Sequence, residues 1–224
     1  MPRTARAAKG GVIYHISNRG NGRGVVFRKR KDYEMFMEIL EAGRQRASIE
    51  VFGFCLMPTH WHLVVRPRRD GDLSAYLSWI TNTHVKRHRV RYPHTRGRLY
   101  HGRYKSFPVQ SGRHLVNLMR YVESNPQRAK LKKRAENWPW SSLGCDKKVA
   151  SALLDPWPAD RPKHWRKLVG KSLKKSDRDA VVASLKRSRP LGEDRWVTTM
   201  ARKTGSLQTL HPIGRPPRQA TKAK

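Results

Sequence analysis

Cysteine, acidic side chains and long apolar runs are all scarce in this sequence of 224 residues. The two cysteines, Cys55 and Cys145, have neither the spacing of a zinc finger nor that of a disulfide framework, so we expect both to be reduced and structural. The first ten residues are basic, but no apolar stretch of signal-peptide length follows them. No other window approaches the length of a membrane-spanning helix. These features predict a cytoplasmic protein without a membrane partner.

The shortage of acidic residues leaves a large excess of positive charge. Asp and Glu number 16 against 49 Lys and Arg, a formal net charge of +33. Such an excess predicts a polyanionic partner, because each phosphate that a basic side chain neutralises releases condensed counterions. Nucleic acid fits better than an anionic membrane surface, since no long amphipathic helix with aromatic anchors is present. No Walker-type glycine loop is present either, so we expect no nucleotide cofactor.

The spacing of apolar residues predicts an α+β fold. Alternating patterns indicate strands, and spacings of three and four residues indicate helices. The predicted strands are residues 12–17, 49–56, 60–65 and 104–109, and the predicted helices are residues 31–46, 73–91 and 112–125. We expect Asp32 to cap the first helix, and Pro126 to halt or kink the third. This order is that of a ferredoxin-like split βαβ unit with an antiparallel sheet, helices on one face and one extra helix.

The composition changes after about residue 150, where Pro, Lys and Arg become frequent. We expect a catalytic domain at residues 1–149 and a small helical extension at 150–210, with helical patches at 177–187 and 194–203. The last residues, 211–224, hold three prolines and no apolar periodicity, which predicts a disordered basic tail.

Two histidines share one face of a predicted strand. Successive side chains of a strand point to opposite faces, so His60 and His62 lie side by side while Trp61 points the other way. Such a pair binds a divalent cation if a third ligand lies nearby. Two exposed histidines that meet DNA phosphates remain the alternative interpretation.

The third predicted helix carries a tyrosine outside its apolar stripe. Tyr121 and Asn125 are four residues apart and therefore face the same way. A tyrosine at such a boundary is often structural. In a basic protein with a histidine pair, however, it suggests attack on a phosphodiester. A phenol ordinarily has a pKa of about 10, so this attack needs help from a metal and basic neighbours. The product would be a covalent phosphotyrosine, which conserves the bond energy for rejoining.

Several ordered motifs resemble one known family. The segments concerned are YHISNRGNGR, MPTHWHLVV, RYKSFPV and LMRYVESNPQRAKLKKRAENWPWSS. They resemble the REP-associated tyrosine transposases, a branch of the single-tyrosine HUH transposases of bacteria, over nearly the whole chain. The resemblance implies a bacterial, nucleoid-associated enzyme that cuts and rejoins single-stranded DNA beside palindromic hairpins.

The resemblance also implies residue roles. His60 and His62 would bind the metal, Mg²⁺ or Mn²⁺, with Asn125 as the third ligand. Tyr121 would be the nucleophile. The residues that we expect to contact DNA are Arg103, Lys105, His114, Arg128 and, in the tail, Arg215 and Arg218.

Two other functions remain open. The chain could be a hairpin DNA- or RNA-binding protein that does not cleave, although intact Tyr121, His60 and His62 argue against this. It could also be a replication-initiator or relaxase enzyme of the same superfamily. Relaxases place the tyrosine before the histidines, whereas here it follows them. The expected partner is single-stranded or hairpin DNA, and both a monomer and a homodimer are compatible with the sequence.

Overall fold

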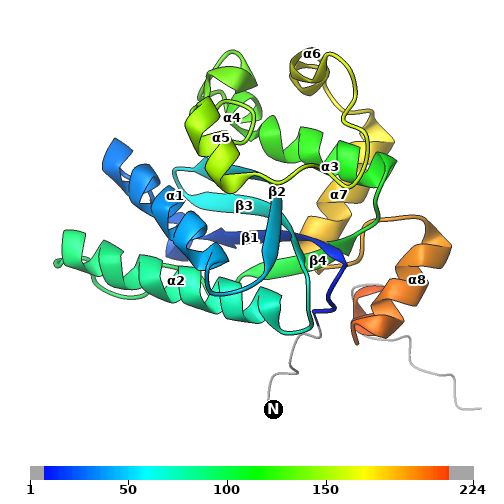
Figure 1. Cartoon of the computed structure of the whole chain (residues 1–224), viewed down its shortest axis with the longest axis horizontal. Coiled ribbons are helices and arrows are strands. Elements are labelled where there is room, and N and C mark those ends of the chain that lie inside the picture. The colour runs from blue at the N-terminus through cyan, green and yellow to red at the C-terminus, as the bar shows by residue number, and fades with distance from the viewer. Residues whose placement is uncertain (1–7, 212–224) are drawn as a thin grey trace, which may run out of the picture.

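The computed structural model describes residues 8–211, and its centre is a four-stranded antiparallel sheet (Figure 1). The strands are β1 (Ile13–Arg19), β2 (Ile49–Met57), β3 (His60–Pro67) and β4 (Lys105–Val109), in the spatial order β2-β3-β1-β4. Helix α1 (Arg30–Arg44) follows β1, and α2 (Asp72–Arg91) follows β3. This order and pairing confirm the predicted α+β, ferredoxin-like split βαβ fold.

Helices cover both faces of this sheet, so the prediction of helices on one face was wrong. Helices α1 and α2 lie on one face, whereas α3 (Arg113–Glu123) lies on the other beside α7 (Lys175–Arg187) (Figure 1). The reason is that the strands are apolar on both sides. Ile16 and Leu63 point to the α1 and α2 side, while Phe52, Val64 and Phe107 point to the α3 side. An apolar face is stable only when another layer buries it.

The helices begin and end within a few residues of the predicted positions. Asp32 does not occupy the N-cap position of α1 but lies in its first turn, where its carboxylate accepts the backbone N–H groups of Arg28 and Lys29 at 2.8 and 2.9 Å. The acid at N3 therefore accepts the backbone N–H of the N-cap residue Lys29, and its negative charge suits the first turn of a helix. Helix α2 ends at Arg91, two residues before Pro93, as predicted.

Helix α3 ends at Glu123, and a short helix, α4 (Asn125–Arg128), follows it. Pro126 lies in the first turn of α4, where its missing N–H costs no helical hydrogen bond. The predicted break near Pro126 is therefore confirmed. Gly53 lets α3 approach β2 closely, because a Cβ at this position would lie 2.1 Å from the Met119 Cε atom.

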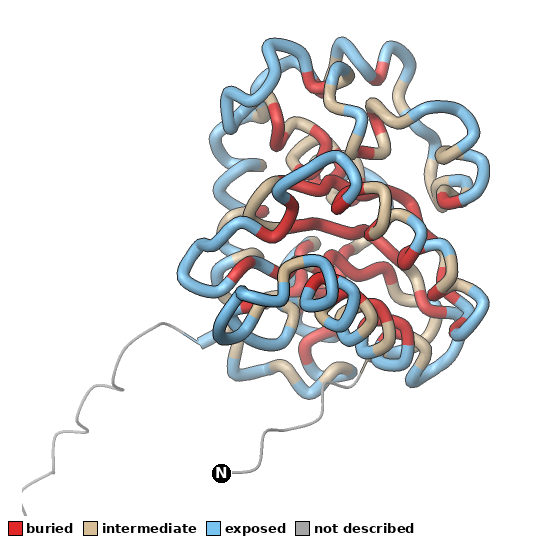
Figure 2. Tube along the Cα trace, turned by 90° about the vertical axis from the view of Figure 1, so that its left-hand side faces the viewer, coloured by how far each residue is buried: buried red, intermediate tan, exposed pale blue. Residues whose placement is uncertain are grey.

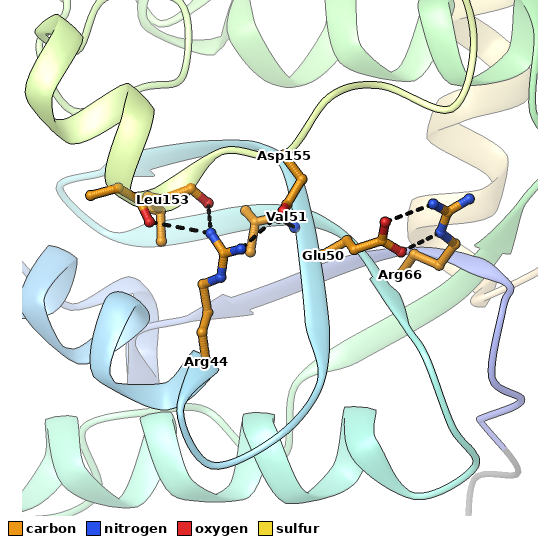
Figure 3. Close-up of polar contacts among 7 residues, drawn as sticks. Arg44, Glu50, Val51, Arg66, Leu153 and Asp155 are labelled. Atoms are coloured by element: carbon orange, nitrogen blue, oxygen red, sulfur yellow. Dashed lines mark hydrogen bonds and ion pairs between the residues drawn. The ribbon is translucent and has the colours of Figure 1, made fainter.

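The chain beyond α4 closes both edges of the sheet. Backbone groups of β2 pair with the segment from Trp138 to Asp155, for example Leu56 N with Trp140 O at 2.8 Å. Figure 3 shows the end of this segment, where Asp155 accepts the Val51 N–H at 2.8 Å and the Arg44 guanidinium at 2.9 Å. At the other edge, Leu191 pairs with β4. Unpaired sheet edges invite association with other chains, and the backbone pairing of these two segments with β2 and β4 covers the edges.

The remaining helices are α5 (Lys147–Leu153), α6 (Trp165–Gly170) and α8 (Asp194–Lys203), together with three short 3-10 turns at Asn21–Arg23, Ala135–Asn137 and Leu207–Thr209. The helical patches predicted at 177–187 and 194–203 correspond to α7 and α8. Figure 2 shows that buried positions concentrate along the strands and the inner sides of the helices. Within residues 8–211 no helix combines the length and apolar character needed to cross a membrane. The boundary at residue 149 remains a prediction.

Candidate active site

A cleft of about 560 Å³ opens between the sheet and α3 at the end of β1 and the start of β3. It gathers side chains from five separate parts of the chain, including α7 of the C-terminal extension. Its lining consists of Ser17, Asn18, Arg19, Arg23, Thr59, His60, His62, His101, Gly102, Arg103, Lys105, Tyr121, Asn125 and Leu185. The cleft therefore brings the predicted nucleophile and all three predicted metal ligands together.

The two histidines of β3 present neighbouring imidazoles to this cleft. The ring centroids of His60 and His62 lie 5.0 Å apart with the rings perpendicular. His60 Nδ1 lies 3.1 Å from Thr59 Oγ1, so Nε2 is its nitrogen available to a ligand. Trp61 points into the opposite core with no exposed surface, and its indole N–H donates to the Tyr100 hydroxyl at 2.9 Å. The alternation predicted for this strand is confirmed.

A third imidazole lies behind the pair. His15 Nε2 is 2.9 Å from His62 Nδ1, and both side chains are buried. Burial lowers the pKa of His15 to about 3 and that of His62 well below its usual value, where the neighbouring imidazoles and Arg128 add to the effect. Burial, with the positive charges of Arg128 and Arg19, lowers the pKa of His60 to about 4. All three rings are therefore neutral near pH 7, the form in which imidazole binds metals.

Tyr121 faces the histidines from α3, and Arg128 holds the side chains around it. The Arg128 guanidinium lies 3.7 Å from the centre of the Tyr121 ring, a cation–π contact. The same guanidinium donates to Asn125 Oδ1 at 2.9 Å. The carbonyl oxygen of Asn125, which the sequence predicts as a metal ligand, thus already accepts a hydrogen bond from a cation.

His60, His62 and Asn125 offer two imidazoles and one amide oxygen, donor types that a divalent cation accepts. Between residues 8 and 211, no group of three or more His, Cys, Asp or Glu side chains has a geometry suited to a metal ion. A third ligand at this cleft would therefore come from an uncharged oxygen, and two amides line it, those of Asn18 and Asn125. The set of His60, His62 and Asn125 contains the imidazole and carbonyl ligands that divalent transition metals accept.

The rim of the cleft is basic. Arg103 and Lys105, both predicted to contact DNA, line the cleft and are exposed. The structure adds Arg19, Arg23 and His101, which sequence reasoning missed. Arg19 lies directly across from His60 in the β1–β3 register. Its position in the strand, two residues after Ser17 and four after His15, is the period-two signal that would have placed it on the histidine face.

The other predicted DNA contacts lie elsewhere. His114 is in the first turn of α3 and lines a separate hollow with Asp177 and Glu193, so the structure does not bring it to the cleft. Arg215 and Arg218 fall outside the described residues. A DNA contact by any of these residues stays a prediction.

The fold and this set of side chains define a class. A ferredoxin-like sheet with two strand histidines that face a helix tyrosine across a basic cleft is the architecture expected of the single-tyrosine HUH proteins. The chain belongs to the IS200-like transposase family, whose model matches residues 8–125. This confirms the predicted family and supports a role in DNA processing as a transposase.

One solved structure supports the fold, and a second is reported beside it. A REP-associated tyrosine transposase bound to a REP hairpin matches 78% of this chain and 100% of its own, with a TM-score of 0.54 and 19% identity. At that identity the likeness concerns the fold alone. A crystal structure of a Deinococcus radiodurans R1 protein assigned as a transposase covers 55% of this chain and 97% of its own, with a TM-score of 0.39 and 16% identity. A comparison with curated proteins found no match.

Proposed function

We propose that this chain is a metal-dependent single-stranded DNA endonuclease and strand transferase, with Tyr121 as its nucleophile. One observation carries the proposal. Tyr121 and the pair His60 and His62 come from elements about 60 residues apart in sequence, yet they line one cleft. Membership of the IS200-like transposase family supports it, because transposases cut and join DNA strands.

His60, His62 and Asn125 are the residues that would hold a divalent cation, Mg²⁺ or Mn²⁺. When bound, such a cation polarises a non-bridging phosphate oxygen and offsets the negative charge that develops there. The protein prepares this site by keeping both imidazoles neutral through burial. Arg128 must share or release Asn125 Oδ1 for the amide to act as a ligand, because a guanidinium and a metal cation repel each other at one oxygen.

The cleavage step is a transesterification. The Tyr121 hydroxyl gives up its proton to solvent as its oxygen forms a bond to phosphorus. The bond from phosphorus to the 3′ oxygen breaks, and that oxygen takes up a proton from solvent to become a 3′ hydroxyl. The 5′ end of the DNA remains attached to Tyr121 as a phosphotyrosine. Attack by another 3′ hydroxyl reverses these changes and joins a new strand. Arg19, Arg103 and Lys105 lie where they can bind the DNA backbone beside this phosphate.

We propose a hairpin with a single-stranded flank as the substrate. The net charge of +33 suits a nucleic acid, and a protein of the same fold has been solved bound to a REP hairpin. Of the tail arginines, which lie outside the described residues, Arg215 stands between a glycine and a proline, and Arg218 follows two prolines. Such a segment suits an extended arm in a narrow groove.

Tyr121→Phe tests the proposal, because it removes only the attacking oxygen. With a labelled, flanked hairpin and Mg²⁺ or Mn²⁺, we expect the wild type to form a protein–DNA adduct that survives denaturation. We expect Tyr121→Phe to form none while its affinity for the hairpin stays unchanged. Tyr104→Phe, the same change just before β4, is the control and should form the adduct.

Two results would contradict the proposal. An adduct with Tyr121→Phe would place the nucleophile elsewhere, and Tyr104 would be the next candidate. A wild type that binds the hairpin tightly but never forms an adduct with either metal would favour the alternative of a non-cleaving binding protein.

A further inference from the structure

His15 lies directly behind the proposed metal ligand His62 and touches it through one hydrogen bond. Its Nε2 atom is 2.9 Å from His62 Nδ1, and the two ring centroids are 5.1 Å apart. In the β1–β3 register His15 faces Val64, the next residue along β3 on the face that carries His62. Such diagonal neighbours are within reach of aromatic side chains. The ring of His15 also stacks on Phe107 at 4.8 Å, which fixes its plane.

His15 has no other role visible in the structure. Its side chain has no exposed surface, so it cannot itself bind DNA or a metal in the cleft. Its second nitrogen, Nδ1, is buried and has no hydrogen-bond partner within residues 8–211. A buried polar atom without a partner is unfavourable, and such atoms concentrate at functional sites. The contact with His62 is thus the one polar interaction that this ring makes in the described structure.

The shared hydrogen bond allows two arrangements of protons. A neutral imidazole carries one N–H, and of the two nitrogens that face each other at 2.9 Å one must donate and the other accept. In the first arrangement His62 Nδ1–H donates to His15 Nε2, and the His62 Nε2 lone pair is free to face the cleft. In the second arrangement His15 Nε2–H donates, and His62 carries its proton on Nε2, where it blocks a cation.

We propose that His15 is a positioning residue that accepts the His62 Nδ1–H and thereby holds the His62 Nε2 lone pair toward the cleft. This inference rests on the proposed metal site. Because no group within residues 8–211 pairs with His15 Nδ1, no described neighbour on its far side fixes which nitrogen is protonated. The occupant of the cleft therefore selects the arrangement, and a bound cation selects the first. Hydrogen bonds behind metal-binding histidines commonly set ring orientation and tautomer in this way.

The tautomers can be observed directly in the wild-type protein. We expect long-range ¹H–¹⁵N spectra of histidine-labelled protein to show, on addition of Zn²⁺ as a diamagnetic probe, His62 protonated at Nδ1 and bound through Nε2. His15 should then be protonated at Nδ1 as well. Binding of Zn²⁺ through His62 Nδ1, or a His62 that keeps its proton on Nε2, would overturn the proposal.

Variants test the same point through metal affinity. We expect His15→Phe, which keeps the ring but removes the acceptor, to weaken Mn²⁺ binding by about 10- to 100-fold, measured by electron paramagnetic resonance of free Mn²⁺. His15→Gln restores an acceptor at a similar reach and should recover part of the affinity. The matched control is His84→Phe, a buried histidine on the opposite face of the sheet, which should bind Mn²⁺ as the wild type does.

The outcomes separate this inference from the proposed function. If His62→Ala loses Mn²⁺ binding but folded His15→Phe keeps it, His15 does not position the ligand and only this inference fails. If His62→Ala also keeps wild-type affinity, the metal site itself is misplaced and both fail. Equal losses in His15→Phe and His15→Gln, with thermal stability unchanged, would likewise exclude a role for the acceptor.

Discussion

The two faces of the sheet come from the same four strands and both bury imidazoles, yet these imidazoles have different surroundings. The layer of α1 and α2 buries His84, His88 and Asp32 among large apolar side chains. The Tyr100 hydroxyl accepts the Trp61 indole N–H at 2.9 Å and also contacts His84 Nδ1. These surroundings suit a contribution to stability.

The face covered by α3 also buries imidazoles and a carboxylate, but here a buried imidazole, that of His62, lines the cleft. His15 and His62 are enclosed there, as is Glu123, which accepts the Ser142 hydroxyl and the Trp165 indole N–H at 2.6 Å each. Polar groups in a low-dielectric layer are costly unless paired, and they concentrate where chemistry needs them. On the proposed function, one strand, β3, would contribute to stability through Trp61 and to chemistry through the residues on either side of it.

The largest expected effect is on the α3 face. We expect His60→Ala and His62→Ala each to lower the rate of adduct formation by about 100-fold or more, since metal-assisted charge stabilisation is worth several kcal/mol. Thermal unfolding should change little. EDTA should have the same effect on the wild type, and excess Mg²⁺ or Mn²⁺ should restore activity. Unchanged cleavage in EDTA would leave both histidines as phosphate contacts.

Trp61, which lies between His60 and His62 in β3, should affect stability rather than activity. Trp61→Ala should lower the free energy of unfolding by about 3–5 kcal/mol, because it empties a fully buried site. The fraction that remains folded should still form the adduct. Trp61→Phe, which keeps most of the volume, is the milder variant, and denaturant unfolding measures both. A stable Trp61→Ala protein without activity would break the division of roles along β3.

The buried carboxyl group of Glu123, at the end of α3, predicts a pH dependence of stability. Burial raises the pKa of its carboxyl group, and the hydrogen bonds from Ser142 and Trp165 oppose this only in part. The folded state therefore holds the proton to higher pH than the unfolded chain does. Its contribution to stability is full below the ordinary pKa of about 4.5 and is lost as the pH rises through the raised value.

We therefore expect Glu123→Gln to flatten the decline in stability with rising pH, measured by urea unfolding from acid to neutral pH. Glu136→Gln is the control, because a salt bridge with Arg134 helps to lower the pKa of Glu136. Parallel curves for wild type and Glu123→Gln would show that the carboxyl is ionised throughout.

The smallest expected effect concerns the rim of the cleft. Arg103→Ala should weaken binding to all DNA sequences alike and reduce the slope of log affinity against log salt by about one. His114→Ala should change the slope less, because His114 lies in a different hollow. A larger effect for His114 would extend the DNA-binding surface along α3 to its first turn.

Local patterns in the sequence determined much of this molecule. Period-two alternation placed His60 and His62 on one side of β3 and Trp61 on the other. Helical spacing placed Leu115, Leu118 and Met119 in the core and left Tyr121 outside that stripe. Such patterns are readable because neighbours within a few residues fix which way a side chain points.

Only the tertiary structure decided which distant side chains contact His62 and line the cleft. The contact between His15 and His62 spans 47 residues and depends on the register of β1 against β3. The second helical layer, with Leu185 in the cleft wall, depends on where the extension docks. These contacts follow from the packing of distant segments, which no local spacing in the sequence specifies.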